Sequence, residues 1–277
     1  MTGTGQTILA IVPARSGSKG FPGKNMATLG PDKDGKSKPL VRWPYDTLQD
    51  LIDRDRKVGD HIVRWLSTDS QKIVEAWPQI PLGEIKLRPK NLARDDSAAI
   101  DVIKYELERY ELERYEDESC GEADVGAVLW FQPTSPLVNS EDILAMIRAL
   151  DQDTYPARSD RTGPGDSGLG AIHYGSARSV IAVTPAVHPL QWGMYRHEDG
   201  TVENPLHELG TGRRQEQPVA YYPIGVFLAT VPYIQEHGTA VVPGLTRSVV
   251  VPRERAVDID TEDDLVVAEA YLKKQMR

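Results

Sequence analysis

Short apolar runs alternate with longer segments of helical periodicity along this chain, and that alternation limits the folds open to it. Residues 8–12 and 125–131 are nearly continuous apolar runs, which is the pattern of strands buried on both faces. Helical periodicity is expected from Leu40 to about Arg54, from Ser97 to about Glu118 and from Ser140 to Leu150. Strands alternating with helices predict an α/β fold with an open, mostly parallel sheet.

Weaker signals add further elements to this sheet. Strands are expected at 61–66, 85–87, 180–184, 219–229 and 249–251. Either Asp69 or Ser70 caps a helix that runs to about Trp77, and Thr261 with Asp264 forms a capping-box pattern at the start of the last helix. Ligands of such sheets bind beyond the carboxyl ends of the strands, so the loops at 14–25, 67–70 and 132–136 are expected on one rim.

Length and charge exclude several classes of protein. The 277 residues suit a single domain with a substantial core, 1–277. The net charge of −9 disfavours nucleic acid as a partner, and no apolar run approaches the roughly 20 residues that cross a bilayer. The N-terminus lacks the pattern of a secretion signal, so a cytoplasmic location is expected. Cys120 is the single cysteine, which excludes an internal disulfide and a multi-cysteine zinc site.

Two segments depart from regular periodicity. Residues 151–176 are rich in Gly, Ser, Asp and Arg, which predicts a flexible lid or an insertion. The pentapeptide ELERY occurs at 106–110 and again at 111–115. A step of five residues turns about 500° around a helix, so the two copies do not share a face. We interpret this segment as a charged, mostly solvated helix.

The strongest local signal is the loop at 13–25, PARSGSKGFPGKN, which follows the first buried strand directly. Its glycines let the backbone approach a ligand closely, and Arg15, Lys19 and Lys24 place three positive charges in ten residues. The loop is neither a Walker loop nor a G-x-G-x-x-G fingerprint. It predicts a triphosphate-binding loop; the alternative is a basic surface loop.

Six stretches in the same order give the chain a resemblance to a known family. They are IVPARSGSKGFPGKN at 11–25, LSTDS at 66–70, RPKNLARDDS at 88–97, FQPTSP at 131–136, RRQ at 213–215 followed by YYPIG, and DIDTEDDL at 258–265. Together they resemble the CMP-sugar synthetases, the acylneuraminate cytidylyltransferases, over nearly the whole length. The resemblance implies a Rossmann-like sheet of the nucleotidyltransferase type, CTP as the nucleotide and Mg²⁺ as the metal.

The resemblance also implies a site and a reaction. An acceptor oxygen would attack the α-phosphorus of CTP in line, and pyrophosphate would leave. The expected catalytic residues are Arg15, Lys24, Asp258 and Asp260, the last two holding Mg²⁺. The expected nucleotide-binding residues are Arg15, Ser16, Gly17, Ser18, Lys19, Lys24, Asn25, Arg88 and Ser97. The expected acceptor-binding residues are Gln132, Gln191, Arg213, Arg214 and Gln215.

Some of these residues can also be interpreted from their chemistry alone, without the family resemblance. Two aspartates separated by one residue can present hard oxygens to Mg²⁺, although such a pair also suits a solvated turn before a helix. Arg213 and Arg214 can clamp a carboxylate with a guanidinium fork, or form an exposed ion-pairing loop. Asp69 either caps the helix that follows it or supports the nucleotide pocket, and the sequence does not separate the two.

The chain departs from sialic-acid-activating members of the family on the acceptor side. Ile224-Gly225-Val226 stands where those members carry Asn-Gly-Ala, and Gln191 stands where they carry Lys. We therefore hypothesise that the acceptor is not ordinary N-acetylneuraminate but a different nonulosonic or 2-keto-3-deoxy sugar acid. The alternatives are a small phosphonate as acceptor, a catalytically inactive nucleotide-binding regulatory protein, and a dinucleotide-dependent oxidoreductase. The resemblance further implies a homodimer in which residues about 185–215 close the partner's acceptor pocket.

Overall fold

The computed structural model describes residues 7–17, 20–31, 35–76, 80–81, 84–116, 124–151, 178–204, 213, 215 and 217–275. The insertion or lid predicted at 151–176 lies outside the described residues apart from the last residue of a helix, Asp151. Ser18, Lys19 and Arg214, which are predicted site residues, also lie outside them.

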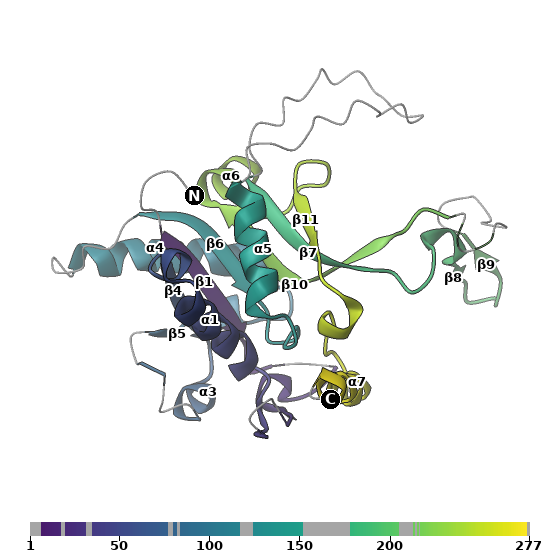
Figure 1. Cartoon of the computed structure of the whole chain (residues 1–277), viewed down its shortest axis with the longest axis horizontal. Coiled ribbons are helices and arrows are strands. Elements are labelled where there is room, and N and C mark those ends of the chain that lie inside the picture. Colours follow the sequence, from purple (N-terminus) through teal and green to yellow (C-terminus); the bar gives the residue numbers. More distant parts are fainter. Residues whose placement is uncertain are drawn as a thin grey trace, which may run out of the picture.

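A seven-stranded sheet forms the centre of the molecule, with the strand order β11-β7-β10-β6-β1-β4-β5 (Figure 1). Its strands are β1 (Thr7–Ala14), β4 (Ile62–Thr68), β5 (Ile85–Leu87), β6 (Val125–Phe131), β7 (Ser179–Pro185), β10 (Tyr221–Thr230) and β11 (Arg247–Val250). Neighbouring strands are parallel except at β10, which runs antiparallel to both β6 and β7. The predicted α/β fold with an open, mostly parallel sheet is confirmed.

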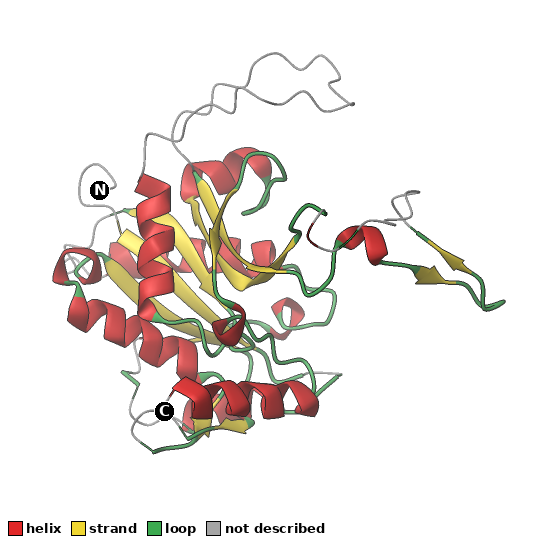
Figure 2. Cartoon of the chain, turned by 45° about the vertical axis from the view of Figure 1, so that its right-hand side comes forward, coloured by secondary structure: helices red, strands yellow, loops and turns green. Residues whose placement is uncertain are grey.

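Helices cover both faces of this sheet (Figures 1 and 2). The helices are α1 (Arg42–Arg54), α2 (Arg56–Gly59), α3 (Gln71–Glu75), α4 (Ala99–Glu116), α5 (Ser140–Asp151), α6 (Val231–His237) and α7 (Glu262–Gln275). Apolar side chains of α1 and α5 pack on one face of the sheet, and those of α4 and α6 pack on the other. The central strands β1 and β6 are therefore buried from both sides, as their nearly continuous apolar sequences predict.

The apolar faces of the predicted helices point inward. Ile143, Met146, Ile147 and Leu150 of α5 are all buried, and Ala268 and Leu272 of α7 belong to a separate small cluster. At the start of α7 the Thr261 and Asp264 side chains each accept a hydrogen bond from the other's backbone amide, which confirms the predicted capping box.

The helix that carries the ELERY duplication is less solvated than predicted. The two copies do lie on different faces, because Tyr110 is buried whereas Tyr115 is 75% exposed. The first copy, however, packs on the sheet, and Glu106 is fully buried there. The charged composition of the segment hides this inward face, so the expectation of a mostly solvated helix holds for the second copy only.

An arm leaves the body between β7 and β10 (Figure 1). The arm comprises residues 186–204 with the described residues 213, 215 and 217–220, and it carries the antiparallel pair β8 (Tyr195–Arg196) and β9 (Val202–Glu203). A second short pair, β2 (Thr28–Leu29) and β3 (Lys38–Pro39), follows the basic loop. No helix in the described part of the chain is long and apolar enough to span a bilayer.

Candidate active site

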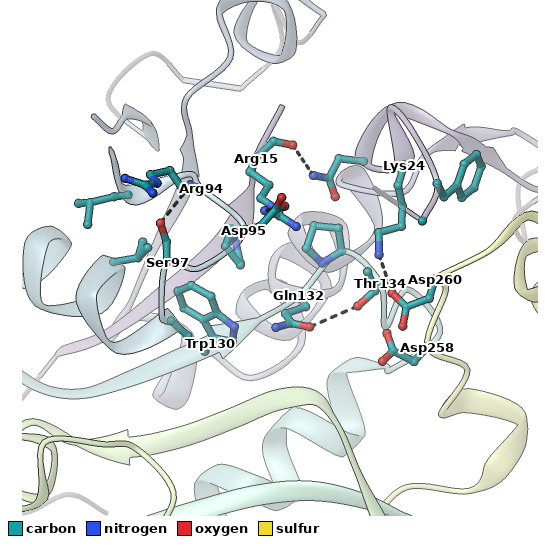
Figure 3. A pocket seen from close by; sticks show the side chains of 18 of the residues that line it. Arg15, Lys24, Arg94, Asp95, Ser97, Trp130, Gln132, Thr134, Asp258 and Asp260 are labelled. Atoms are coloured by element: carbon teal, nitrogen blue, oxygen red, sulfur yellow. Dashed lines mark hydrogen bonds and ion pairs between the residues drawn. The ribbon is translucent and has the colours of Figure 1, made fainter. Parts of the chain in front are cut away.

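A cleft of about 600 Å³ opens at the carboxyl ends of β1 and β6 (Figure 3). The loop after β1, the segment 88–97 after β5, the loop after β6 and the segment before α7 all contribute to it. Its lining includes Arg15, Lys24, Asn25, Arg88, Arg94, Asp95, Ser97, Trp130, Gln132, Thr134, Asp258 and Asp260. Two of the three loops expected on one rim line this cleft, and the third, at 67–70, is hydrogen-bonded to the loop after β1 without lining the cleft itself.

Basic side chains of the loop after β1 point into this cleft (Figure 3). The Arg15 guanidinium forms an ion pair of 2.6 Å with Asp95, and the Lys24 ammonium forms one of 2.7 Å with Asp260. The buried Asn25 amide donates a hydrogen bond of 2.8 Å to the Arg15 carbonyl oxygen, which ties the two ends of the loop together. The cations thus stand at fixed positions on either side of one cavity.

Asp69 holds this loop in place. Its carboxylate accepts hydrogen bonds of 2.7 Å from the Ser16 amide and 2.6 Å from the Ser16 hydroxyl. The cap of α3 is instead Ser70, whose hydroxyl accepts from the Ile73 amide. Of the two roles open to Asp69 in the sequence, the structure shows support of the basic loop and assigns the cap to its neighbour.

Neighbouring substitutions separate these two roles. Asp69→Ala is expected to raise the KM for CTP about tenfold, because the loop loses two charge-assisted hydrogen bonds and its cations are less well placed. Ser70→Ala is expected to lower the free energy of unfolding by about 1 kcal/mol through the lost helix cap, with the KM for CTP unchanged. Steady-state kinetics and chemical denaturation of both variants test this, and an unchanged KM in Asp69→Ala contradicts it.

A pair of carboxylates faces the basic loop from the segment before α7 (Figure 3). Asp258 and Asp260 line the cleft, while Ile259 between them is fully buried and its amide donates a hydrogen bond of 2.8 Å to the Thr134 carbonyl oxygen. Burial of the carboxyl raises the pKa of Asp258, the charge of Asp260 adds to this rise, and a hydrogen bond from Thr134 and the charge of Lys24 oppose it. Because the side chain of Ile259 points into the core, the side chains on either side of it, those of Asp258 and Asp260, both point toward the cavity.

The chemistry of these two carboxylates is compatible with Mg²⁺, the metal that the family resemblance implies. Among the residues that the structure describes, no group of three or more His, Cys, Asp or Glu side chains is arranged to hold a metal ion. Mg²⁺ is commonly held by one or two carboxylates together with substrate phosphates and water, so a pair of hard oxygen donors beside a basic loop is a suitable donor set. The binding of Mg²⁺ stays a prediction.

The remaining nucleotide-side predictions fall on the same cleft. Arg88 and Ser97 line it, and Arg88 is only 7% exposed. The Ser97 hydroxyl accepts a hydrogen bond from the Arg94 amide and donates one to the Asn91 carbonyl oxygen, which holds the segment 88–97 in a compact turn. Ser16 and Gly17 lie on the loop itself rather than in the lining. Their binding roles stay predictions.

The acceptor-side predictions divide between the cleft and the arm. Gln132 lines the cleft beside Gly225, where an added Cβ would lie 2.6 Å from the Gln132 Oε1 atom, so glycine is required for this approach. Gln191, Arg213 and Gln215 belong to the arm and do not line the cleft of their own subunit. Their predicted contact with the acceptor stays a prediction.

A second groove of about 860 Å³ adjoins the cleft at Asp258. It runs between the root of the arm and α7, and its lining includes His188, Leu190, Trp192, Tyr222, Arg253, Val267 and Tyr271. Its walls are largely apolar, with the guanidinium of Arg253 and the carboxylates of Asp258 and Asp264 as charged groups.

Several residues that line the cleft were not predicted from the sequence. Arg94 and Asp95 lie inside the motif RPKNLARDDS, and the contact between Asp95 and Arg15 joins residues 80 positions apart. Trp130 was expected in the core and is indeed buried, yet it also lines the cleft (Figure 3). Its place next to the carboxyl end of β6 is the sequence signal that could have indicated this second role.

An open, mostly parallel sheet with a basic loop after its first strand and a carboxylate pair facing that loop is the architecture of an α/β nucleotidyltransferase. The family model "Cytidylyltransferase" matches residues 9–182, which is more than half of the chain. The chain therefore belongs to the cytidylyltransferase family.

Curated relatives match over almost the whole length. The chain is 26% identical over 271 residues to a CMP-N,N'-diacetyllegionaminic acid synthase of Legionella pneumophila, with 96% of each protein covered. It is 23% identical over 265 residues to a pseudaminic acid cytidylyltransferase of Campylobacter jejuni, again with 96% of each covered. These matches confirm the resemblance to CMP-sugar synthetases.

Solved structures match in fold. A CMP:2-keto-3-deoxy-manno-octonic acid synthetase complexed with CTP superposes with a TM-score of 0.55 and 13% identity, covering 98% of this chain and all of that one. A 4-diphosphocytidyl-2C-methyl-D-erythritol synthase from Anaerococcus prevotii gives a TM-score of 0.55 and 15% identity, covering 97% of this chain and 99% of that one. At these identities the likeness supports the fold alone.

Proposed function

We propose that this protein transfers CMP from CTP to an acidic sugar, a nonulosonic or related 2-keto-3-deoxy acid, and releases pyrophosphate. The observation that carries the proposal is the 2.7 Å ion pair between Lys24 and Asp260, residues 236 positions apart. It brings the basic loop and the acidic pair together in one cleft, where a triphosphate and its metal are needed side by side. The family to which the chain belongs supports cytidylyl transfer as the reaction.

The residues of the cleft lower the barrier to CMP transfer mainly by positioning the reactants and by neutralising charge. The new bond joins an acceptor oxygen to the α-phosphorus, and the bond from that phosphorus to the pyrophosphate oxygen breaks. Arg15 and Lys24 neutralise charge on the phosphates and on the departing oxygens. Arg88, Asn25 and Ser97 bind the nucleoside end of CTP at the inner part of the cleft, and Gln132 meets the acceptor.

Asp258 and Asp260 would hold Mg²⁺ when CTP is bound. When bound, the metal would supply charge neutralisation to the phosphates and acid activation to the acceptor. Lys24 would then pair with the phosphates, because the ammonium and the metal compete for the Asp260 carboxylate.

The groove beside Asp258 supports a sugar acid as acceptor. It continues the cleft past the carboxylate pair, and Arg253 in its wall can face a carboxylate. The curated relatives described above are named for sugar acids other than N-acetylneuraminate, in line with the departures at Ile224 and Gln191. A phosphonate acceptor, an inactive regulatory protein and an oxidoreductase find no support in these comparisons.

A panel of acceptors tests the proposal. The protein is incubated with CTP, Mg²⁺ and one acid at a time: N,N'-diacetyllegionaminic acid, pseudaminic acid, N-acetylneuraminate, 2-keto-3-deoxy-manno-octonate and a simple phosphonate. Pyrophosphate release and the mass of the CMP conjugate are measured. We expect turnover with a sugar acid other than N-acetylneuraminate. Preference for N-acetylneuraminate refutes the acceptor assignment, and CTP binding without pyrophosphate release from any acid refutes the enzyme.

We propose further that two copies associate through the arm. Met194, Tyr195 and Val202 of the arm are each more than half exposed, which is unusual for apolar side chains gathered on one projecting segment. A second copy that covers the arm would bring the arm residues Gln191, Arg213 and Gln215 to its partner's acceptor groove.

Aspartate substitutions in the arm test this association. The unsubstituted protein is expected to have the mass of a dimer by light scattering, and Tyr195→Asp with Val202→Asp is expected to give a monomer because two charges would be buried unpaired. The exposed Leu112→Asp of α4 is the matched control and is expected to leave the mass unchanged. A monomeric unsubstituted protein, or a dimer that survives both aspartates, contradicts the proposal.

A further inference from the structure

A buried carboxylate lies behind the nucleotide side of the cleft. Glu106 of α4 is fully buried, although it belongs to a helix whose second ELERY copy is exposed. It does not line the cleft. Burial of an ionisable side chain is energetically costly unless its charge is compensated. The groups that Glu106 contacts therefore indicate its role.

Glu106 connects to Arg88 through a single hydroxyl group. The Arg88 Nη1 atom donates hydrogen bonds of 3.0 Å to the Ser67 hydroxyl oxygen and 2.8 Å to the Ser67 carbonyl oxygen. The Ser67 hydroxyl in turn donates a hydrogen bond of 2.6 Å to Glu106. A serine hydroxyl carries one proton, and because that proton goes to the carboxylate, the oxygen lone pairs are left facing Arg88.

The second oxygen of the carboxylate is buried, accepts no hydrogen bond from the described residues and faces a guanidinium group. Arg109 lies 3.4 Å from the second Glu106 oxygen, and its own guanidinium donates hydrogen bonds to the Leu87 carbonyl oxygen and the Tyr105 hydroxyl.

Burial raises the pKa of Glu106, and the hydrogen bond from Ser67 and the charges of Arg109 and Arg88 oppose this rise. Burial lowers the pKa of Arg88, and the charges of Asp69 and then Glu106 oppose that shift. The carboxylate thus lies between two guanidinium groups that compensate its charge.

Arg88 retains an unused donor. Its Nε atom is buried and has no hydrogen-bond partner among the described residues, while the residue lines the cleft. A buried donor without a partner is unfavourable, so the position is not built for stability alone. Arg88 is held on the protein side through its Nη1 atom, and the 7% of the residue that is exposed contributes to the wall of the cleft.

We propose that Glu106 is a positioning residue for nucleotide binding, which acts on Arg88 through the Ser67 hydroxyl. This inference rests on the proposed function, because the nucleotide is the ligand that Arg88 would meet. Without the carboxylate the Ser67 hydroxyl is free to rotate, and Arg88 is left with the Ser67 carbonyl oxygen as its fixed acceptor, so its orientation is less well defined.

The duplication supplies a matched control. Glu111 occupies the place in the second ELERY copy that Glu106 occupies in the first, but it is exposed. In Glu106→Gln a neutral amide replaces the carboxylate between Ser67 and Arg109. Its NH₂ group is a hydrogen-bond donor, so it faces the donor group of either Ser67 or Arg109. We expect the Kd for CTP, measured by calorimetric titration, to rise about tenfold in Glu106→Gln and in Ser67→Ala, and to stay within twofold in Glu111→Gln.

Two further readouts separate positioning from a merely structural role. The KM for CTP is expected to rise with the Kd while kcat falls less than threefold, whereas loss of folded protein would lower kcat and leave KM unchanged. In an Arg88→Ala background, Glu106→Gln is expected to have no added effect on the Kd, because its route to the ligand is gone.

The opposite results overturn the inference. A Kd within twofold of the unsubstituted protein in Glu106→Gln does so, as does an undiminished effect in the Arg88→Ala background. If Glu106→Gln does not fold, an unchanged Kd in Ser67→Ala decides in the same way. Absence of CTP binding by the unsubstituted protein contradicts the proposed function instead, so the two failures are distinguishable.

Discussion

Asp260→Ala is expected to lower kcat by about a thousandfold or more, with the fold intact. The substitution removes one of the two carboxylates proposed to hold Mg²⁺ and leaves Lys24 without its partner. The Asp260 side chain is 71% exposed in the ion pair, so its removal should change the free energy of unfolding little. Pyrophosphate release at saturating CTP and acceptor measures the effect, and a melting curve checks the fold.

A neighbouring aspartate is the control for this variant. Asp263 lies in the first turn of α7, three residues further on, and is exposed. Asp263→Ala removes the same charge at nearly the same place without touching the cleft, so kcat should stay within about twofold. Equal losses in both variants would indicate a general electrostatic effect rather than a metal site.

Arg15→Ala is expected to lower kcat/KM for CTP by a factor of about 10² to 10³. The Arg15 guanidinium faces the cleft, and in the proposed reaction it neutralises the phosphates and the departing pyrophosphate. Arg15→Lys keeps the charge but not the planar fork and should recover part of the activity. Initial rates over a range of CTP concentrations give the values.

An arginine outside the cleft provides the comparison. Arg54 forms an ion pair with Asp50 on α1 and is 59% exposed. Arg54→Ala should be nearly neutral for both activity and stability, because exposed ion pairs contribute little. Near-normal turnover in both Asp260→Ala and Arg15→Ala would discredit the site as a whole.

Local sequence predicted most of the central fold. The strand expected at 125–131 has those bounds in β6, and the helix expected from Leu40 to Arg54 is α1 from Arg42 to Arg54. Periodicity and caps are properties of neighbouring residues, so they can be read without the rest of the chain. The helix expected to reach Trp77 was too long, because α3 ends at Glu75. Pro78 is the sequence signal for this earlier end, since the residue before a proline is disfavoured in helical backbone.

Features that depend on distant partners were not predictable in this way. The antiparallel direction of β10 is set by the strands that pair with it. The two-residue strands of the short pairs likewise depend on their partner strands. Helix α6 was missed because its seven residues follow β10 directly after Thr230, whose hydroxyl forms the cap. Apolar composition continues from strand into helix there, although Thr230 as a cap and Pro232 in the first turn are sequence signals that could have indicated the helix.

The site residues also differ in whether the sequence could predict them, according to whether they are contiguous or come from distant segments. The basic loop and the aspartate pair were identifiable because each is a contiguous motif, and the family order of motifs placed them together. The network of Ser67, Arg88 and Glu106 was not, because its members come from three elements and the glutamate stands in a strongly charged repeat. Charged composition predicts exposure on average, and a single buried charge is visible only once its partners are in place.

A crystal structure with CTP and Mg²⁺ tests the central claim most directly. We expect the triphosphate between Arg15 and Lys24, with the metal bound to phosphate oxygens and to Asp258 and Asp260. CTP bound elsewhere on the molecule, or in the cleft with its phosphates turned away from both the loop after β1 and the aspartates, would contradict the account.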